Sequence, residues 1–368
     1  MINQENHIGT IDKVASALVR ALLCWLVAWA LLPANAYADS ATCRSNYSAF
    51  TLSMPAAVAV ARDLPNGSIL TAWSLSPLKS DYYTCTVVGS VYTGTDFETA
   101  GVTTDSRTTY TVTYNGVAFA VYPTTVPGIG IAMGGYVVPD GRQTNLRSFE
   151  KMGSQWNYPG TIYNGGQLIV ALVKIGDVTP GTLSGTIAQA FSWQTLTPPP
   201  AGNVLSAGVI DFNISPVVIT VLTCETPDVT VPMGTQGPAD LPSVGAAPSK
   251  VIGFNLSFNN CPAGAAVPNT SAGLIHSVQY RIDPTNGTIA GFTDVAALNG
   301  SPSAGGVGIQ LYDSTGSVFG FGVNRTLSGF DGTRNSSYSL PMTARYYRTG
   351  ALSAGPANAT MTLTVLYL

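Results

Sequence analysis

The sequence predicts an all-β protein built from two immunoglobulin-like β-sandwich domains, and three observations lead to this prediction. Short runs with the period-two alternation of strands recur along the whole chain. Glycine (39) and proline (24) are frequent and separate these runs as turns. Beyond residue 38, no stretch of a dozen residues has the apolar period of a helix. A chain of 368 residues is long enough for two domains, each with its own core.

Two Asn-Gly pairs mark candidate hairpins. In "RTTYTVTYNGVAFAVY", two alternating runs flank Asn115 and Gly116. The stretch "AVAVARDLPNGSILTAW" places Asn66 and Gly67 in the same way. Asn-Gly suits the two-residue turns that join antiparallel strands, so we expect a hairpin at each pair.

The charge balance excludes some classes of partner. Charged residues make up 10% of the chain, against roughly 25% in an average globular protein. The formal net charge is −3 and the pI is about 5.3. A chain of this kind offers no basic surface for nucleic acid or anionic lipid.

The N-terminus reads as a secretory signal peptide. Lys13 and Arg20 precede an apolar run over residues 21–32, which is shorter than the roughly 20 residues of a membrane-spanning helix. "AYA", ending at Ala38, supplies the small residues for cleavage, and "ANA", ending at Ala36, is the alternative. We therefore expect residues 1–38 to be removed and the mature chain to be exported as a soluble protein.

The cysteines divide the mature chain into two halves. Cys24 lies in the signal peptide, and four cysteines remain: Cys43, Cys85, Cys224 and Cys261. Four cysteines allow three connectivities, and local pairing, Cys43–Cys85 and Cys224–Cys261, is the economical one for an oxidising compartment. A zinc site is the alternative, but it would lack a Cys-x-x-Cys motif and would have only His276 as a histidine ligand.

We place the domain junction near Ser215-Pro216, which gives domains 39–215 and 216–368. "VLSAGVIDFNIS" reads as the closing strand of the first domain, and "PVVITVLTC" leads into the second. The second domain contains six predicted strands, starting with "CETPDVTVPMG", whereas an immunoglobulin-like sandwich uses seven. Its last strand, "MTLTVLYL", carries Met361, Leu363, Val365 and Tyr367 on one face and borders the gap.

Residues 224–368 resemble the pilin domain of chaperone–usher fimbriae. The resemblance rests on Cys224 with "DVTVPMG", Cys261, "GVGIQLYDSTG", "ARYYRTG" and "AGPANATMTLTVLYL". Residues 39–215 resemble the receptor-binding domain of two-domain, type 1-like fimbrial tip adhesins through Cys43, "VPGIGI" and "GGQLIVALVKIG".

The resemblance implies partners and a place in a fibre. Such a pilin domain is completed by a strand from a periplasmic chaperone and then from the next pilin subunit, during assembly at an outer-membrane usher. The groove is expected to involve Met361, Leu363, Val365 and Tyr367, and the chaperone is expected to capture the carboxylate of Leu368. Because only Asp39 to Thr42 precede Cys43 in the mature chain, we expect no donor strand and hence a position at the fimbrial tip on the cell surface.

Receptor-binding candidates come from the polar and aromatic loops of the first domain. "DSATC", "TVVGS" and "IGDVTPGT" do not match the mannose pocket of type 1 fimbrial adhesins, so mannose is not expected. Sugars are bound by hydrogen-bonding side chains beside an aromatic face. Candidates of this kind are Asp81, Tyr82, Tyr83, Tyr92, Asp96, Asp140, Arg142, Gln143, Asn145, Trp156, Asn157, Tyr158, Asp177 and Thr179. Turn chemistry is the alternative explanation for the Asp and Asn residues among them.

Enzymatic readings find little support. His276 lies inside a predicted strand, no phosphate loop, metal cluster or cofactor motif is present, and no pair of carboxylates is distinctively spaced. We therefore expect a fimbrial tip adhesin without a cofactor, which attaches to a host or surface receptor, a glycan by preference. The alternatives are a minor pilin without receptor binding, an adhesin for a protein and a carbohydrate-active enzyme.

Overall fold

The computed structural model describes residues 39–154, 156–195, 208–246, 250–300 and 303–368. Over these ranges the regular structure consists of strands and two 3-10 helices, η1 (Phe149–Lys151) and η2 (Pro238–Asp240). In the same ranges, no helix has the length and apolar character needed to cross a membrane. The expected signal peptide and its cleavage sites lie outside the described residues.

The first unit is a sandwich of two sheets. One sheet has the order β1-β5-β12-β9-β8-β7, with β10 on β9 and β4 on β12. The other has the order β11-β6-β13-β14-β2, with β3 on β14. The strands are β1 (Ser40–Ser45), β2 (Ala49–Leu52), β3 (Ala57–Ala61), β4 (Ser74–Leu75), β5 (Lys79–Val88), β6 (Tyr92–Thr99), β7 (Thr111–Tyr114), β8 (Val117–Pro123), β9 (Ile129–Pro139), β10 (Arg147–Ser148), β11 (Trp156–Asn157), β12 (Gly160–Lys174), β13 (Gly181–Thr195) and β14 (Ile210–Leu222).

Strand β12 shows why a continuous apolar run forms a strand here. Leu168, Val170 and Leu172 point into the main core between the sheets. Ile169 and Val173 belong to a second apolar cluster, which includes residues of the β7–β8 hairpin. Because both faces of β12 are covered, its sequence needs no polar alternation.

The two Asn-Gly pairs have different outcomes. Asn115 and Gly116 form the expected two-residue turn between β7 and β8, with Tyr114 opposite Val117 and positive φ angles of 45° and 80°. The hairpin expected at Asn66-Gly67 is wrong. Strand β3 pairs in parallel with β14 instead of folding back on the residues after Gly67.

The second unit has one four-stranded and one three-stranded sheet. The orders are β15-β20-β16, with β18 on β20, and β19-β17-β21. The strands are β15 (Gly245–Ala246), β16 (Ile252–Cys261), β17 (Val278–Pro284), β18 (Gly305–Tyr312), β19 (Arg325–Thr326), β20 (Ser336–Ser353) and β21 (Met361–Tyr367). The first expected strand, Cys224 to Gly234, contributes only an isolated bridge between Glu225 and Asn259. Pro227 and Pro232 in this segment lack the backbone N–H that a ladder needs.

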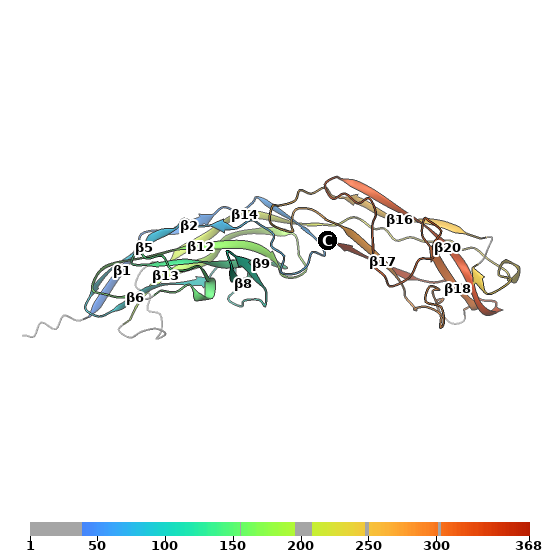
Figure 1. Cartoon of the computed structure of the whole chain (residues 1–368), viewed down its shortest axis with the longest axis horizontal. Coiled ribbons are helices and arrows are strands. Elements are labelled where there is room, and N and C mark those ends of the chain that lie inside the picture. The colour runs from blue at the N-terminus through green and yellow to red at the C-terminus, as the bar shows by residue number, and fades with distance from the viewer. Residues whose placement is uncertain (1–38, 155, 196–207, 247–249, 301–302) are drawn as a thin grey trace, which may run out of the picture.

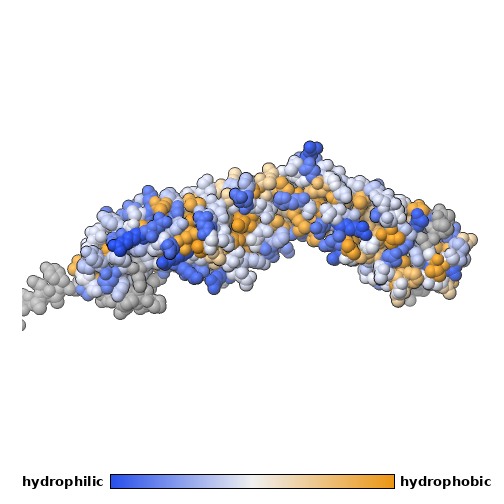
Figure 2. Space-filling view, viewed as in Figure 1, coloured by the Kyte–Doolittle hydropathy of each residue, from blue (hydrophilic) through white to orange (hydrophobic). Residues whose placement is uncertain are grey.

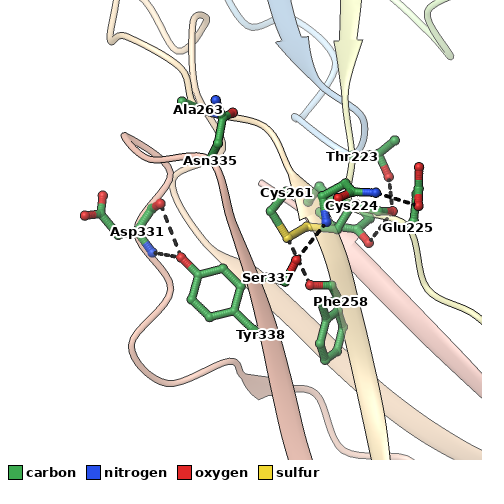
Figure 3. Close-up of a disulfide and its surroundings, with 12 residues drawn as sticks. Thr223, Cys224, Glu225, Phe258, Cys261, Ala263, Asp331, Asn335, Ser337 and Tyr338 are labelled. Carbon is green, nitrogen blue, oxygen red and sulfur yellow. Dashed lines mark hydrogen bonds between the residues drawn. A yellow bond between two sulfur atoms is a disulfide. The ribbon is translucent and has the colours of Figure 1, made fainter.

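Both disulfides are the pairs predicted from the sequence. Cys43–Cys85 joins β1 to β5, where the two cysteines are register partners. Cys224–Cys261 ties the start of the second unit to the end of β16 (Figure 3). Beside it, Glu225 and Asn259 exchange two backbone hydrogen bonds of 2.8 Å. The segment that lacks a strand is thus still anchored at its first residue.

The two units lie end to end, and the chain's C-terminal end lies where they meet (Figure 1). Strand β14 continues through Ser215 and Pro216 to Leu222, and β3 pairs with it as far as Leu222. Across the junction, the N–H of Gly273 donates to the carbonyl of Ala59 at 2.8 Å. The end of β21 is therefore held close to the first unit.

Candidate functional site

The inward face of β21 carries the apolar residues that the alternation predicts. Val365 and Tyr367 are buried, with 7% and 1% of their surface exposed, whereas Met361 and Leu363 are half-buried against the core. Thr362, on the opposite face, is exposed. The apolar side chains are thus covered at one end of the strand and partly open at the other.

Only one edge of β21 is paired in a ladder. Leu368 and Ser277 exchange two backbone hydrogen bonds of 3.0 Å, which fixes the parity of the β17–β21 ladder. By this parity, the N–H and C=O groups of Met361, Leu363, Val365 and Tyr367 point to the edge that faces away from β17. No other described strand pairs with β21. An added strand would find unpaired backbone groups at this edge.

The side chain of Tyr367 is buried and is held by a hydrogen bond and by a contact with a guanidinium group. Its hydroxyl donates to the carbonyl of Cys224 at 3.2 Å, and burial raises its pKa. The guanidinium of Arg62, from the first unit, lies 4.7 Å from the centre of its ring. The side chain therefore joins the disulfide, β21 and the first unit.

The surface of the protein has apolar patches along both units and a shallow depression in the second unit. Apolar residues reach the surface in several patches along both units (Figure 2). A depression beside the Cys224–Cys261 disulfide is lined by Asn260, Cys261, Pro262, Asn335, Ser336 and Ser337. Ser337 Oγ already accepts the backbone N–H of Asn260, and Asn335 Oδ1 accepts that of Ala263, so these polar atoms tie together the two segments that line the depression (Figure 3).

A second candidate lies at the end of the first unit that is remote from the junction. There Trp156 is the register partner of Thr93, and Asn157 that of Tyr92. The guanidinium of Arg142 lies 5.3 Å from the centre of the Trp156 ring. The structure therefore brings Tyr92 close to the segments that carry Arg142 and Trp156, which are far from it in the sequence. We call Tyr92, Arg142, Trp156, Asn157 and Tyr158 the distal cluster.

The distal cluster has both polar and aromatic surface. Tyr158 is 60% exposed, and Trp156 is half-buried. Asn157 is exposed, and its Nδ2 donates to Ser90 Oγ at 3.1 Å. Asp140 has a φ of 47° and forms a turn with Gly141, as the alternative explanation expected. Gln143 and Asn145 are exposed in the loop that also carries Arg142.

The structure removes Tyr82 and Tyr83 from the candidate site. Both are buried between the sheets, and the Tyr83 hydroxyl donates to the Ala190 carbonyl at 2.7 Å. Between Lys79 and Tyr83 strand β5 advances four positions, whereas β12 advances two, so a bulge turns adjacent tyrosines inward. Burial raises the pKa of both hydroxyls. The alternation rule could not show this bulge.

Two acidic candidates on strands make local contacts. Asp81, on β5, accepts a hydrogen bond from the Tyr47 hydroxyl at 3.2 Å. Asp96, on β6, is partly buried, and its Oδ1 accepts the N–H of Phe97 at 2.9 Å. Burial raises the pKa of the Asp96 carboxyl, against the lowering effect of this hydrogen bond.

Asp177 and Thr179 are exposed at the junction end of the first unit. They follow Lys174, whose carbonyl accepts the N–H of Gly67, and the N–H of Thr179 donates to Pro127. The opposite end of β12 leads to the distal cluster. These two residues therefore cannot form one site with it.

Buried polar groups lie inside the first unit behind the distal cluster. Thr93, Thr95, Asn164 and Ser192 are buried. Within the described residues, the Oγ1 atoms of Thr93 and Thr95 and the Oδ1 of Asn164 have no hydrogen-bond partner. Such atoms are usually satisfied by water or a ligand. Sequence reasoning missed them, although the alternation of Thr93 and Thr95 with Phe97 could have placed them on the inward face.

Comparisons with known proteins agree with the second unit's architecture. The fimbrial protein family profile matches residues 218–367. The chain is 31% identical over 189 residues to the type-1 fimbrial protein A chain of Escherichia coli K12, which covers 50% of this chain and 97% of that protein. It is 36% identical over 142 residues to the fimbrial subunit type 1 of Klebsiella pneumoniae, covering 38% and 71% of the two chains.

Among solved structures, the CupB6 tip adhesin of Pseudomonas aeruginosa covers 89% of this chain and 93% of its own, with 15% identity and a TM-score of 0.33. In the part of the chain that the structure describes, no three His, Cys, Asp or Glu side chains gather as metal ligands.

The match to the K12 protein over nearly its whole length shows the family of this chain. The chain belongs to the fimbrial protein family, whose members are extracellular components of pili and not enzymes.

Proposed function

We propose that this fimbrial protein is the tip adhesin of a chaperone–usher pilus. In this proposal, the second unit accepts a strand from another protein at the free edge of β21, and the first unit binds a receptor at its distal cluster. The observation that carries the proposal is the position of these two features. The unpaired edge lies in the second unit, and the exposed aromatic and polar cluster lies at the remote end of the first unit.

The strand partner would be a periplasmic chaperone during export and the next pilin subunit in the fibre, with assembly at an outer-membrane usher. Strand addition gains affinity from backbone hydrogen bonds and specificity from alternate side chains. The outer edge of β21 offers the backbone groups, and the half-buried Met361 and Leu363 offer apolar surface. The segment from Cys224 to Gly234 forms only the isolated bridge at Glu225, so it has no ladder of its own.

We propose to place the boundary of the two functional domains after Leu222, because β14 carries the first unit's sheet as far as that residue. A division at Ser215-Pro216 would cut this strand. A fragment of the first unit should therefore end beyond Leu222.

A glycan fits the chemistry of the distal cluster. Trp156 and the exposed Tyr158 offer ring faces, and Arg142 and Asn157 offer hydrogen-bond donors beside them. Sugars need this combination of an apolar face with directed polar groups.

The test is a glycan array probed with the full chain, completed by a strand appended to its C-terminus. We expect binding to a defined glycan, loss of it in Trp156→Ala, and its retention in Tyr163→Ala. Tyr163 is a matched control, because it is exposed on β12 with its side chain on the outer face. Binding to immobilised proteins alone would indicate an adhesin for a protein. Absence of binding to either class would indicate a minor pilin without a receptor.

A further inference from the structure

The first unit occupies one end of the outer edge of β21. Residues Arg62 and Asp63, which directly follow β3, form the contact, and we call them the junction turn. The N–H of Asp63 donates to the carbonyl of Tyr367 at 2.9 Å, and the N–H of Tyr367 donates to Asp63 Oδ2 at 2.8 Å. Arg62 Nη2 donates to the carbonyl of Val365. The junction turn thus binds backbone groups that an added strand would otherwise bind.

The rest of the same edge is open. By the parity of the ladder, both backbone groups of Met361 and Leu363, and the N–H of Val365, face away from β17. No hydrogen bond within the described residues reaches these five groups. The free part of the edge therefore ends at Val365.

Side-chain burial changes at the same point. Val365 and Tyr367 are already covered, and Arg62 lies over the ring of Tyr367. Met361 and Leu363 keep part of their apolar surface open. Apolar side chains of an incoming strand gain burial only at the Met361 end, where the transfer of apolar surface from water favours them.

Two further hydrogen bonds hold the first unit in this position. The N–H of Gly273 donates to Ala59 at 2.8 Å, and the N–H of Ser271 donates to Ile69 at 3.2 Å. The ion pair of Arg62 with Asp63 spans 3.0 Å and orders the two side chains in the junction turn. The contact is thus part of a wider junction.

We propose that the junction turn is a stop that limits the length of the strand that β21 accepts. While the two units are docked, an extended strand from another pilus protein pairs only along Met361 to Val365. A strand that continues to Tyr367 must displace Arg62 and Asp63 and so loosen the junction. This inference rests on the proposed strand-accepting function, and it adds that the partner strand is short in the docked form.

The test uses the full chain with a strand of alternating Thr and Val appended to Leu368 through a flexible Gly-Ser linker. One series carries a strand that spans only Met361 to Val365, and the other carries a strand that is long enough to reach Tyr367. Each is made in the wild-type chain, in Asp63→Ala, and in Arg62→Ala with Asp63→Ala. Arg107→Ala with Glu150→Ala is the matched control, because this pair is also a solvent-exposed ion pair of the first unit. The readouts are amide hydrogen exchange along β21 and the melting temperature.

We expect the short and long strands to protect the amides of Leu363 and Val365 equally in the wild type and in the control, with the same rise in Tm. In both Asp63 variants without a strand, the Tyr367 amide should exchange roughly tenfold faster, since it loses its acceptor. In these two variants the long strand should restore the protection of the Tyr367 amide and should raise Tm further than the short strand does. The short strand should leave the Tyr367 amide unprotected.

Three outcomes are distinguishable. The proposed stop would be overturned if the long strand stabilised the wild type more than the short strand and the backbone of Tyr367 paired with the long strand in place of Asp63. An unchanged Tyr367 amide in both Asp63 variants would also overturn it. If neither strand protects Leu363 and Val365 in any variant, the strand-accepting function itself fails, and the stop fails with it.

Discussion

Val365 of β21 lies directly opposite Tyr280 of β17, and both side chains are buried, with 7% and 8% of their surface exposed. The pair therefore joins the last strand to the core of the second unit at the point where the outer edge of β21 changes from open to capped. The ring of Tyr280 stacks in turn on Phe319, with 6.3 Å between the ring centres. Changes at Val365 should thus affect both the core and the strand-accepting edge.

Truncation of Val365 should destabilise the second unit. Val365→Ala removes buried methyl groups and leaves a cavity beside Tyr280, so we expect a loss of about 2–4 kcal/mol in the free energy of unfolding. Thr362→Ala, on the exposed face of the same strand, should change it little. Urea unfolding of the two variants measures the difference. Equal midpoints would contradict the inward position of Val365.

The Cys224–Cys261 disulfide should stabilise the second unit by closing a long loop. The two cysteines are 37 residues apart, and the chain-entropy model gives about 3–4 kcal/mol for such a loop. Replacement of both cysteines by Ala should lower the unfolding free energy by that amount, as measured by denaturant titration. Double replacement of Cys43 and Cys85 should leave the second unit's transition unchanged if the units unfold separately. If either double variant shifted the unfolding transitions of both units, the claim that each disulfide stabilises only its own unit would be contradicted.

The stability of the first unit should depend on pH through Asp96. Burial raises the pKa of this carboxyl in the folded state, so between its unfolded and folded pKa values the native state binds more protons than the unfolded state. The group's contribution therefore becomes more favourable as pH falls through the folded pKa, and its cost is fully present above it. Asp96→Asn keeps an acceptor for the N–H of Phe97 and should raise stability at pH 7 more than at pH 4. Thermal unfolding at both pH values measures the difference, and an equal effect at both would contradict it.

The full chain without a partner strand should self-associate. Its open edge on β21 and the half-buried apolar residues beside it favour pairing with another copy. Light scattering after size exclusion should show oligomers that a strand appended to the C-terminus converts to monomers. A monomeric, protease-resistant chain that needs no added strand would contradict the open edge.

Local chemistry explains what the sequence could predict. Asn115-Gly116 forms its hairpin because the turn and both strands are contiguous. The disulfide pairs follow from proximity in the sequence, and the alternation over β21 predicts which residues face the core. Each of these features depends on residues that are close together in the chain.

Features that depend on distant segments could not be predicted. The residues around Asn66-Gly67 resemble a hairpin, but β3 pairs in parallel with β14, which lies far away in the sequence. The bulge in β5 that buries both Tyr82 and Tyr83 is set by its register with β12. The contact of the junction turn with β21 joins residues separated by 303 and 304 positions. No local pattern in the sequence marks such a contact.

Incorporation into pili tests the central claim, that β21 is the strand-accepting edge of a pilus subunit, most directly. Val365→Asp places a carboxylate on the buried face of β21, where an unpaired charge is costly. Thr362→Asp places the same charge on the exposed face and is the matched control. The measurement is the amount of each variant in pili purified from cells, relative to wild type. We predict that Val365→Asp is absent from pili and that Thr362→Asp is incorporated like wild type, whereas equal incorporation of Val365→Asp and wild type would contradict the claim.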